Sequence, residues 1–215
     1  MKIIITESQY NILNSNLNEN YPEHFDMEYF KTLTSFKKRI NYCNDNLKRI
    51  SSGSSRVVYM IDDEKVLKLA KNRKGLAQNE VEVDYSSEYM LEGIVAPVYD
   101  SHPDNLWLEM GLATKLTKSL FNKISGYNWE DYINAITKYT YTASGGKQGY
   151  DVAMDEELYS NMWEDEFIYE IFQYVGNYDV NPGDLTRLST YGVINDDIVL
   201  IDYGLTHDVY NGYYN

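Results

Sequence analysis

Two aspartates toward the C-terminal end of the chain stand where side chains could do chemistry. Asp184 precedes a predicted strand over residues 191–194, and Asp202 follows a second predicted strand over residues 198–201. A turn over residues 195–197 joins the two strands into a hairpin. The hairpin would bring both carboxylates to one end of a small sheet. Two fixed carboxylates beside a loop suit a divalent metal ion and a proton acceptor.

A lysine interrupts an apolar strand much earlier in the chain. Residues 56–61 and 66–70 favour strands, and the acidic turn at 62–64 joins them into a hairpin that contains Lys68. A single lysine on a half-buried strand is ordinarily a solvent-facing residue. A functional role for Lys68 therefore needs a partner elsewhere in the chain.

The segment after this hairpin offers acidic partners on a predicted helix. Residues 76–85 are rich in helix formers, and an apolar stripe consists of Leu76, Val83 and Met90. Glu82 is the first candidate partner for Lys68 and Glu80 the second. Their directions differ by about 200° at about 100° per residue, so only one of them can face the lysine.

Other segments supply the elements that must position these groups. Further strands are expected over residues 94–99 and 106–109. Amphipathic spacing predicts helices, in chain order, over residues 10–17 (behind a capping box at 6–9), 27–42, part of 112–126, 128–139 and a long one over 155–175. The N-terminal segment 1–46 contains no residues suited to catalysis, and His24 has no partner at metal-ligand spacing.

Composition limits the class of protein. A chain of 215 residues forms one domain or two small lobes, and its 43% apolar content is ordinary for a globular protein. The net charge of −14 argues against a general nucleic-acid binder. No apolar run is long enough to predict a transmembrane helix, the opening residues do not read as a signal peptide, and Cys43 is the sole cysteine. We therefore expect a cytoplasmic protein with no membrane partner.

Taken in order, residues 47–205 resemble the protein-kinase-like family. The order is a hairpin with a small-residue loop, a strand lysine, a helix glutamate, two more strands, helices and the stretch with two aspartates. The resemblance implies an α+β, bilobal fold with an antiparallel-sheet N-lobe and a truncated helical C-lobe. The expected parts are an N-terminal helical extension over 1–46, an N-lobe over 47–110 and a minimal C-lobe over 111–215.

The resemblance assigns the nucleotide site in the N-lobe. Gly53, Ser54 and Ser55 stand where the family has its glycine-rich phosphate loop, with one glycine remaining. Lys68 is similar to the lysine that binds the α- and β-phosphates while paired with a helix glutamate, here Glu82.

The next strand would form the hinge that holds the adenine. Leu108 would close the back of the pocket, and the backbone of Glu109 and Gly111 would hydrogen-bond the base. ATP and Mg²⁺ are the implied cofactors.

The stretch from Asp184 to Gly204 resembles the catalytic and metal loops. Asp184 would accept the proton of a substrate hydroxyl, and Asp202, in Asp-Tyr-Gly, would hold Mg²⁺. Ser189 stands where asparagine would bind a second metal ion and is a shorter, poorer ligand. Only residues 205–215 follow, which leaves no room for the peptide platform of a protein kinase.

The resemblance implies a Mg²⁺-dependent phosphotransferase acting on a hydroxyl of a protein or a small molecule. The alternatives are a pseudokinase that serves as a protein-binding or regulatory module, and a kinase-like enzyme that transfers AMP. An unrelated α+β protein whose aspartates end strands by chance is a further alternative. The expected partners are a nucleotide and a protein partner or substrate. The compact size and the opening residues 1–9 are similar in style to small phage and bacterial proteins.

Overall fold

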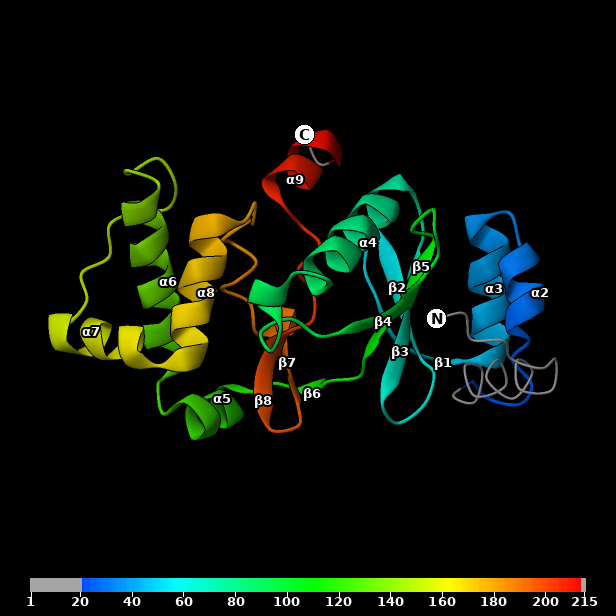
Figure 1. The fold of residues 1–215 in the computed structure, drawn as a ribbon, viewed down its shortest axis with the longest axis horizontal. Coiled ribbons are helices and arrows are strands. Elements are labelled where there is room, and N and C mark those ends of the chain that lie inside the picture. The colour runs from blue at the N-terminus through cyan, green and yellow to red at the C-terminus, as the bar shows by residue number, and fades with distance from the viewer. Residues whose placement is uncertain (1–20, 214–215) are drawn as a thin grey trace, which may run out of the picture.

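The computed structural model describes residues 21–213, and the larger of its two sheets is antiparallel and twisted (Figure 1). Five strands lie in the order β1-β2-β3-β5-β4. They are β1 (Lys48–Ser52), β2 (Arg56–Met60), β3 (Lys65–Ala70), β4 (Val98–Ser101) and β5 (Trp107–Gly111). The sequence did not predict β1, because this polar segment lacks alternating apolar residues. The sequence also placed β4 at residues 94–99, four residues too early at its start.

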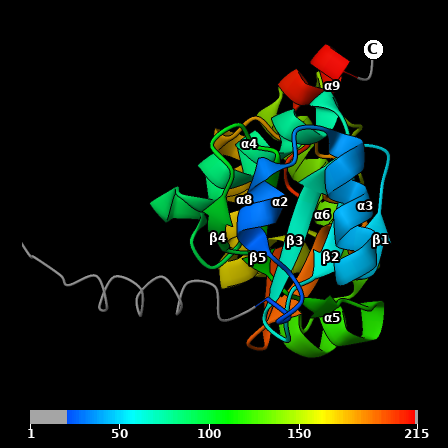
Figure 2. The same ribbon diagram turned by 90° about the vertical axis from the view of Figure 1, so that its right-hand side faces the viewer.

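Two short helices cover one face of this sheet (Figure 2). They are α2 (Met27–Thr32) and α3 (Phe36–Asn46), which replace the single helix predicted over residues 27–42. The break is local, because Ser35 accepts a hydrogen bond from the Lys38 amide and begins a new helix. Phe30 and Cys43 pack there against Tyr59, Leu67 and other side chains of the sheet. The helix predicted over residues 10–17 lies outside the described residues.

Helix α4 (Arg73–Ser86) packs on the opposite face. Asn72 caps its first turn by accepting a hydrogen bond from the Gly75 amide. The helix ends at Ser86, so Met90 does not belong to its apolar stripe, contrary to the prediction. Met90 is 63% exposed and lies in the short 3-10 helix η1 (Tyr89–Leu91).

A helical part follows the sheet. It contains α5 (Lys118–Ser125), α6 (Trp129–Ala143), α7 (Glu156–Glu164) and α8 (Glu166–Asn177). The single long helix predicted over 155–175 is wrong, because Asp165 interrupts it and caps α8 by accepting from the Ile168 amide. The buried aromatic residues Phe121, Trp129 and Tyr132 pack together where α5 and α6 meet.

A second, small sheet lies between the five-stranded sheet and the helices. Its strands are β6 (Thr114–Lys115), β7 (Tyr191–Ile194) and β8 (Asp197–Leu200), in that order, with 3-10 helix η2 (Leu188–Thr190) before β7. Asn195 and Asp196 both have positive φ, at 52° and 71°, which suits the tight turn of a twisted hairpin. The hairpin predicted from the sequence is therefore confirmed.

The last described helix is α9 (His207–Tyr213). Its first turn is held by Asp179, whose carboxylate accepts from the amides of His207 and Asp208.

The α+β class and the antiparallel N-terminal sheet predicted from the sequence are confirmed. The elements also follow one another in the order that the family resemblance implied. Among residues 21–213, the helices lack the length and hydropathy that a membrane crossing requires.

Candidate functional site

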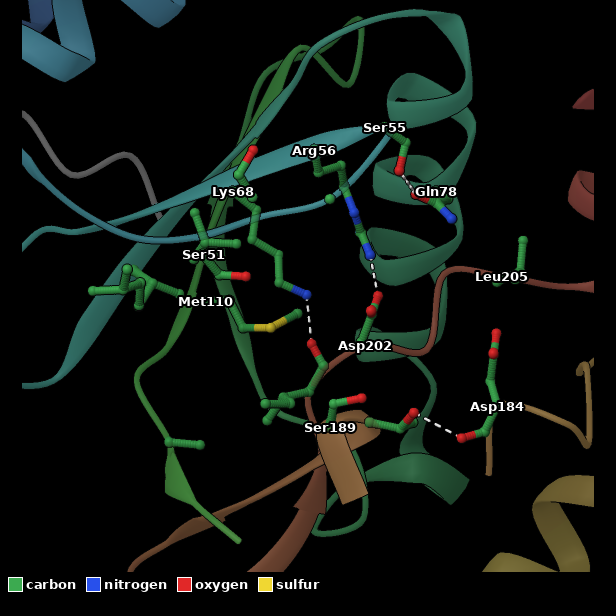
Figure 3. A pocket seen from close by; sticks show the side chains of 18 of the residues that line it. Ser51, Ser55, Arg56, Lys68, Gln78, Met110, Asp184, Ser189, Asp202 and Leu205 are labelled. Atoms are coloured by element: carbon green, nitrogen blue, oxygen red, sulfur yellow. Dashed lines mark hydrogen bonds and ion pairs between the residues drawn. The ribbon is translucent and has the colours of Figure 1, made fainter. Parts of the chain in front are cut away.

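A cleft of about 540 Å³ opens where the two sheets and α4 meet (Figure 3). The cleft is lined by residues 50–56, by positions on β2 and β3, by Gln78 on α4, by residues 110–113, by the turn between Asp184 and Thr190, and by Ile201, Asp202 and Leu205. Segments far apart in the chain therefore converge on one concave surface.

Lys68 and Glu82 form a buried pair inside this cleft. The register of β3 against β2 places Lys68 opposite Val58, on the face that lines the cleft. Lys68 is 6% exposed, and its Nζ donates to Glu82 Oε2 at 2.8 Å and to the Ile201 carbonyl at 2.5 Å. Burial lowers the pKa of Lys68, and the charge of Glu82 opposes that shift.

The helix geometry decides between the two glutamates. Glu82 is fully buried on α4, whereas Glu80 is exposed. The solvent-facing interpretation of Lys68 is therefore wrong, and Glu82, the first choice, is the partner that contacts it. Glu82 Oε1 is buried and has no hydrogen-bond partner within the described part of the chain.

Arg56 is a third charged group at the same place, and the sequence did not predict its role. Its Nη1 lies 2.8 Å from Glu82 Oε2, and its Nη2 forms an ion pair with Asp202 Oδ1. Burial works to lower the pKa of Arg56, but Glu82 and Asp202 outweigh it and raise that pKa. The available signal was alternation, since Arg56 stands two residues before Val58 on one face of a buried strand.

Asp202 lies two residues after the end of β8, and the two residues that follow it fix its loop in place. The Tyr203 hydroxyl is buried within hydrogen-bond distance of the carbonyl oxygens of Ala96, at 2.9 Å, and Glu82, at 3.2 Å. A Cβ on Gly204 would come 2.4 Å from the Gln78 carbonyl, so the chain passes α4 too closely for a side chain. Asp202 itself is open, with 58% of its side chain exposed.

Asp184 lies across the cleft on the turn before η2. Its Oδ1 pairs with Arg187 Nη1 at 2.9 Å, and its backbone carbonyl accepts from the Thr190 hydroxyl at 2.7 Å. Burial raises the pKa of Asp184, and the negative charge of Asp202 adds to this, while Arg187 lowers it. Arg187 is a cleft residue that the sequence did not single out.

The loop with Gly53, Ser54 and Ser55 lines the cleft and is fastened to the start of α4. Its three carbonyls accept hydrogen bonds from the Lys71 side chain, the Asn72 side chain and the Lys71 amide, respectively. A Cβ on Gly53 would meet one atom, at 4.0 Å, so the folded backbone does not require a glycine there. If a glycine is required at position 53, the requirement comes from a ligand that approaches the backbone closely.

Of the three residues predicted to hold the adenine, Gly111 alone lines the cleft. The Glu109 side chain points away from the cleft and accepts from the Tyr21 hydroxyl at 2.7 Å, and burial raises the pKa of Glu109. Gly111 lines the cleft, but its amide donates to the Pro97 carbonyl at 3.0 Å. Leu108 is fully buried in the core, and Met110 lines the cleft in its place.

Oxygen ligands for a metal ion are sparse. Asp202, Asp184 and Ser189 line one cleft, yet no group of three His, Cys, Asp or Glu side chains within residues 21–213 has the geometry of a metal site. Mg²⁺ is commonly held by one or two carboxylates together with substrate phosphates and water. The donor set suits such an ion when a nucleotide supplies the remaining oxygens.

Comparison with known proteins gives distant structural likenesses. No protein-family model and no curated protein matches the chain. The chain is similar to the streptomycin–ATP–APH(2″)-IIa ternary complex at 14% identity and a TM-score of 0.37, covering 94% of this chain and 73% of that one. It is also similar to ADP-bound aminoglycoside phosphotransferase APH(2″)-Ib at 14% identity and a TM-score of 0.37, covering 79% and 69%. A gentamicin–APH(2″)-IIa complex matches at 12% identity and a TM-score of 0.35, covering 94% and 71%. Likenesses this distant carry no inference about activity, which must come from the chain's own residues.

Proposed function

We propose that this chain binds ATP in the cleft and transfers a phosphoryl group to a hydroxyl of a protein or a small molecule. The observation that carries the proposal is the convergence of the buried Lys68–Glu82 pair with Asp184 and Asp202. A buried ion pair is a poor source of stability, because desolvation offsets most of the attraction. Perturbed charged groups gathered in a cleft are typical of functional sites.

Three basic side chains in the cleft would bind a polyphosphate, although each is paired with a carboxylate in the nucleotide-free chain. The chain as a whole carries a net charge of −14, which repels anions. Lys68, Arg56 and Arg187 nevertheless all line the cleft. Lys68 would bind the phosphates while Glu82 holds its ammonium group in place.

The two aspartates have different roles. Asp202, with Ser189 beside it, would hold Mg²⁺, which when bound neutralises charge on the phosphates. Asp184 would accept the proton of the attacking hydroxyl, and its raised pKa makes it a better base than an ordinary aspartate. Arg187 holds the carboxylate at the cleft wall.

Labelled ATP tests the proposal. The purified chain is incubated with a cell lysate, Mg²⁺ and ATP labelled at either the γ- or the α-phosphate. Transfer of the γ-label alone supports phosphotransfer, whereas transfer of the α-label indicates AMP transfer by the same residues. If the label transfer persists in both Asp184→Ala and Asp202→Ala, the cleft is not the active site.

A nucleotide-binding module without catalysis is the second candidate. The specific observation in its favour is that Arg56 pairs with Asp202, the expected metal ligand, while Ser189 is a weak second ligand. This function predicts thermal stabilisation by ATP with no label transfer. At about 100 times its dissociation constant a ligand stabilises the fold by about 2.7 kcal/mol, a shift of a few degrees.

A further inference from the structure

Arg56 bridges two carboxylates that come from different elements. It is the first residue of β2, directly after the loop of Gly53–Ser55, and its side chain is 8% exposed. Glu82, on α4, and Asp202, after β8, both pair with its guanidinium. The contact between Arg56 and Asp202 crosses the cleft (Figure 3).

The register of the sheet makes this convergence possible. Val58 lies opposite Lys68, and Arg56 lies opposite Ala70, so Arg56 and Lys68 are diagonal neighbours on one face. Both side chains therefore reach Glu82 from adjacent strands.

The charges at this point cancel before any ligand binds. Two cations, Arg56 and Lys68, face two anions, Glu82 and Asp202. Lys68 contacts Glu82 and a backbone carbonyl, which leaves Arg56 as the counter-ion of Asp202. A guanidinium stays protonated at any physiological pH, so a change of pH does not release the carboxylate.

We propose that Arg56 is a built-in counter-ion that occupies Asp202 in the nucleotide-free chain and competes with Mg²⁺ for it. The inference rests on the proposed function, because it concerns how the nucleotide and its metal enter the cleft. Mg²⁺ gains Asp202 by displacing Arg56, and this reduces the benefit of Mg²⁺ to nucleotide binding. Arg56 remains paired with Glu82 after the exchange.

Calorimetry with ADP tests the competition without requiring turnover. The ADP dissociation constant is measured with and without Mg²⁺. The value without Mg²⁺ divided by the value with Mg²⁺ gives the factor by which the metal tightens ADP binding. In Arg56→Gln the carboxylate of Asp202 is free, so the ratio rises by about tenfold, the equivalent of one charge-assisted hydrogen bond. In the double variant Arg56→Gln with Asp202→Asn the metal ligand is also gone, so the ratio falls to about one, as it does in Asp202→Asn alone.

Arg187→Gln is the matched control. It also removes one positive charge from the cleft, but among the described residues Arg187 pairs with Asp184 rather than with Asp202. Its ratio stays within about twofold of the wild-type ratio if only Arg56 competes with the metal. An equal rise in both variants indicates a general charge effect and overturns the proposal.

Two further outcomes separate this inference from the proposed function. If the wild-type chain binds ADP and Arg56→Gln leaves the ratio unchanged, the competition is wrong and phosphotransfer stands. If the wild-type chain binds no ADP under either condition, both are wrong. Should Arg56→Gln fail to fold, Arg56→Lys keeps the charge but cannot bridge two carboxylates, and its ratio is expected above that of the wild type.

Discussion

Two arginine–aspartate pairs line the same cleft and differ in how deeply the arginine is buried and in how many elements it connects. Arg56 is almost fully buried and joins β2 to α4 and to the loop after β8 through Glu82 and Asp202. Arg187 is 68% exposed and contacts Asp184 three residues away in the same turn. The first pair thus connects separate elements, whereas the second lowers the pKa of one side chain, Asp184.

The difference in burial between Arg56 and Arg187 explains why removing the two arginines should affect stability unequally. A buried charge that loses its partner retains its full desolvation cost, so breaking such a pair is strongly destabilising. An exposed pair is screened by water and contributes little to stability. We therefore expect Arg56 to affect folding and metal binding, and Arg187 to affect the reactivity of Asp184.

The largest expected effect comes from the aspartates themselves. Asp184→Asn removes the proton acceptor and lowers MgATP turnover by about 10²–10⁴-fold, while ADP still binds. Asp202→Asn lowers turnover as well but also abolishes the effect of Mg²⁺ on ADP binding. A coupled assay for ADP release and calorimetry distinguish the two, and equal behaviour of both variants would contradict the division of roles.

Removing each arginine tests the contrast in burial. Arg56→Ala should cost about 3–5 kcal/mol of unfolding free energy, because the fully buried Glu82 loses one of its two cationic partners, whereas Asp202 is 58% exposed and is solvated. Arg187→Ala should cost no more than about 1 kcal/mol. Urea denaturation of both variants measures the difference, and similar losses would show that burial is not what separates the pairs.

Glycine substitutions test how tightly each wall of the cleft is built. Gly204→Ala places a Cβ 2.4 Å from the Gln78 carbonyl and should cost about 1–3 kcal/mol as the Asp202 loop moves off α4. Gly53→Ala meets no close atom and should stay within about 0.5 kcal/mol. Thermal unfolding of the two variants provides the comparison. A large loss in Gly53→Ala would mean that the loop is packed more closely than the structure shows.

The pH profile of turnover is the smallest expected effect. Burial raises the pKa of Asp184, and only the deprotonated form accepts a proton, so turnover falls as pH drops through this raised pKa. Arg187→Gln removes the charge that lowers the pKa, so the acidic limb should move to higher pH, and by more than in Arg56→Gln. A limb that moves equally in both variants would count against the assignment of Arg187.

The raised pKa of Asp184 should also make the free energy of unfolding depend on pH. The folded chain binds the Asp184 proton more tightly than the unfolded chain, because the folded pKa is the higher one. The corresponding stability is present at low pH and is lost as pH rises through the folded pKa. Asp184→Asn should remove that dependence from urea unfolding measured across the acidic range.

Local patterns were enough for several elements of the site. The apolar character of β3 predicted a strand around Lys68, and the polar turn at 195–197 predicted the β7–β8 hairpin. The angular spacing on α4 showed that Lys68 could face only one of Glu80 and Glu82. These features depend on residues close together in the chain, so the sequence contains the information directly.

Other features depended on contacts that no local pattern records. The helices predicted over 27–42 and 155–175 each break at a capping residue, Ser35 or Asp165, although the apolar spacing continues past it. Arg56 gained its role only when the register of β2 on β3 and the packing of α4 brought it to Glu82. The Glu109 carboxylate accepts a hydrogen bond from the Tyr21 hydroxyl, 88 residues away in the chain, and no local pattern indicates that contact.

The sequence by itself determined the α+β class, the order of the elements and the positions of Lys68, Asp184 and Asp202 on them. Tertiary structure alone decided that Arg56, rather than solvent, is the partner of Asp202. The physical reason is that strand and helix periodicities are local, whereas an ion pair spanning 146 residues of sequence exists only once the sheet, α4 and the hairpin are packed together.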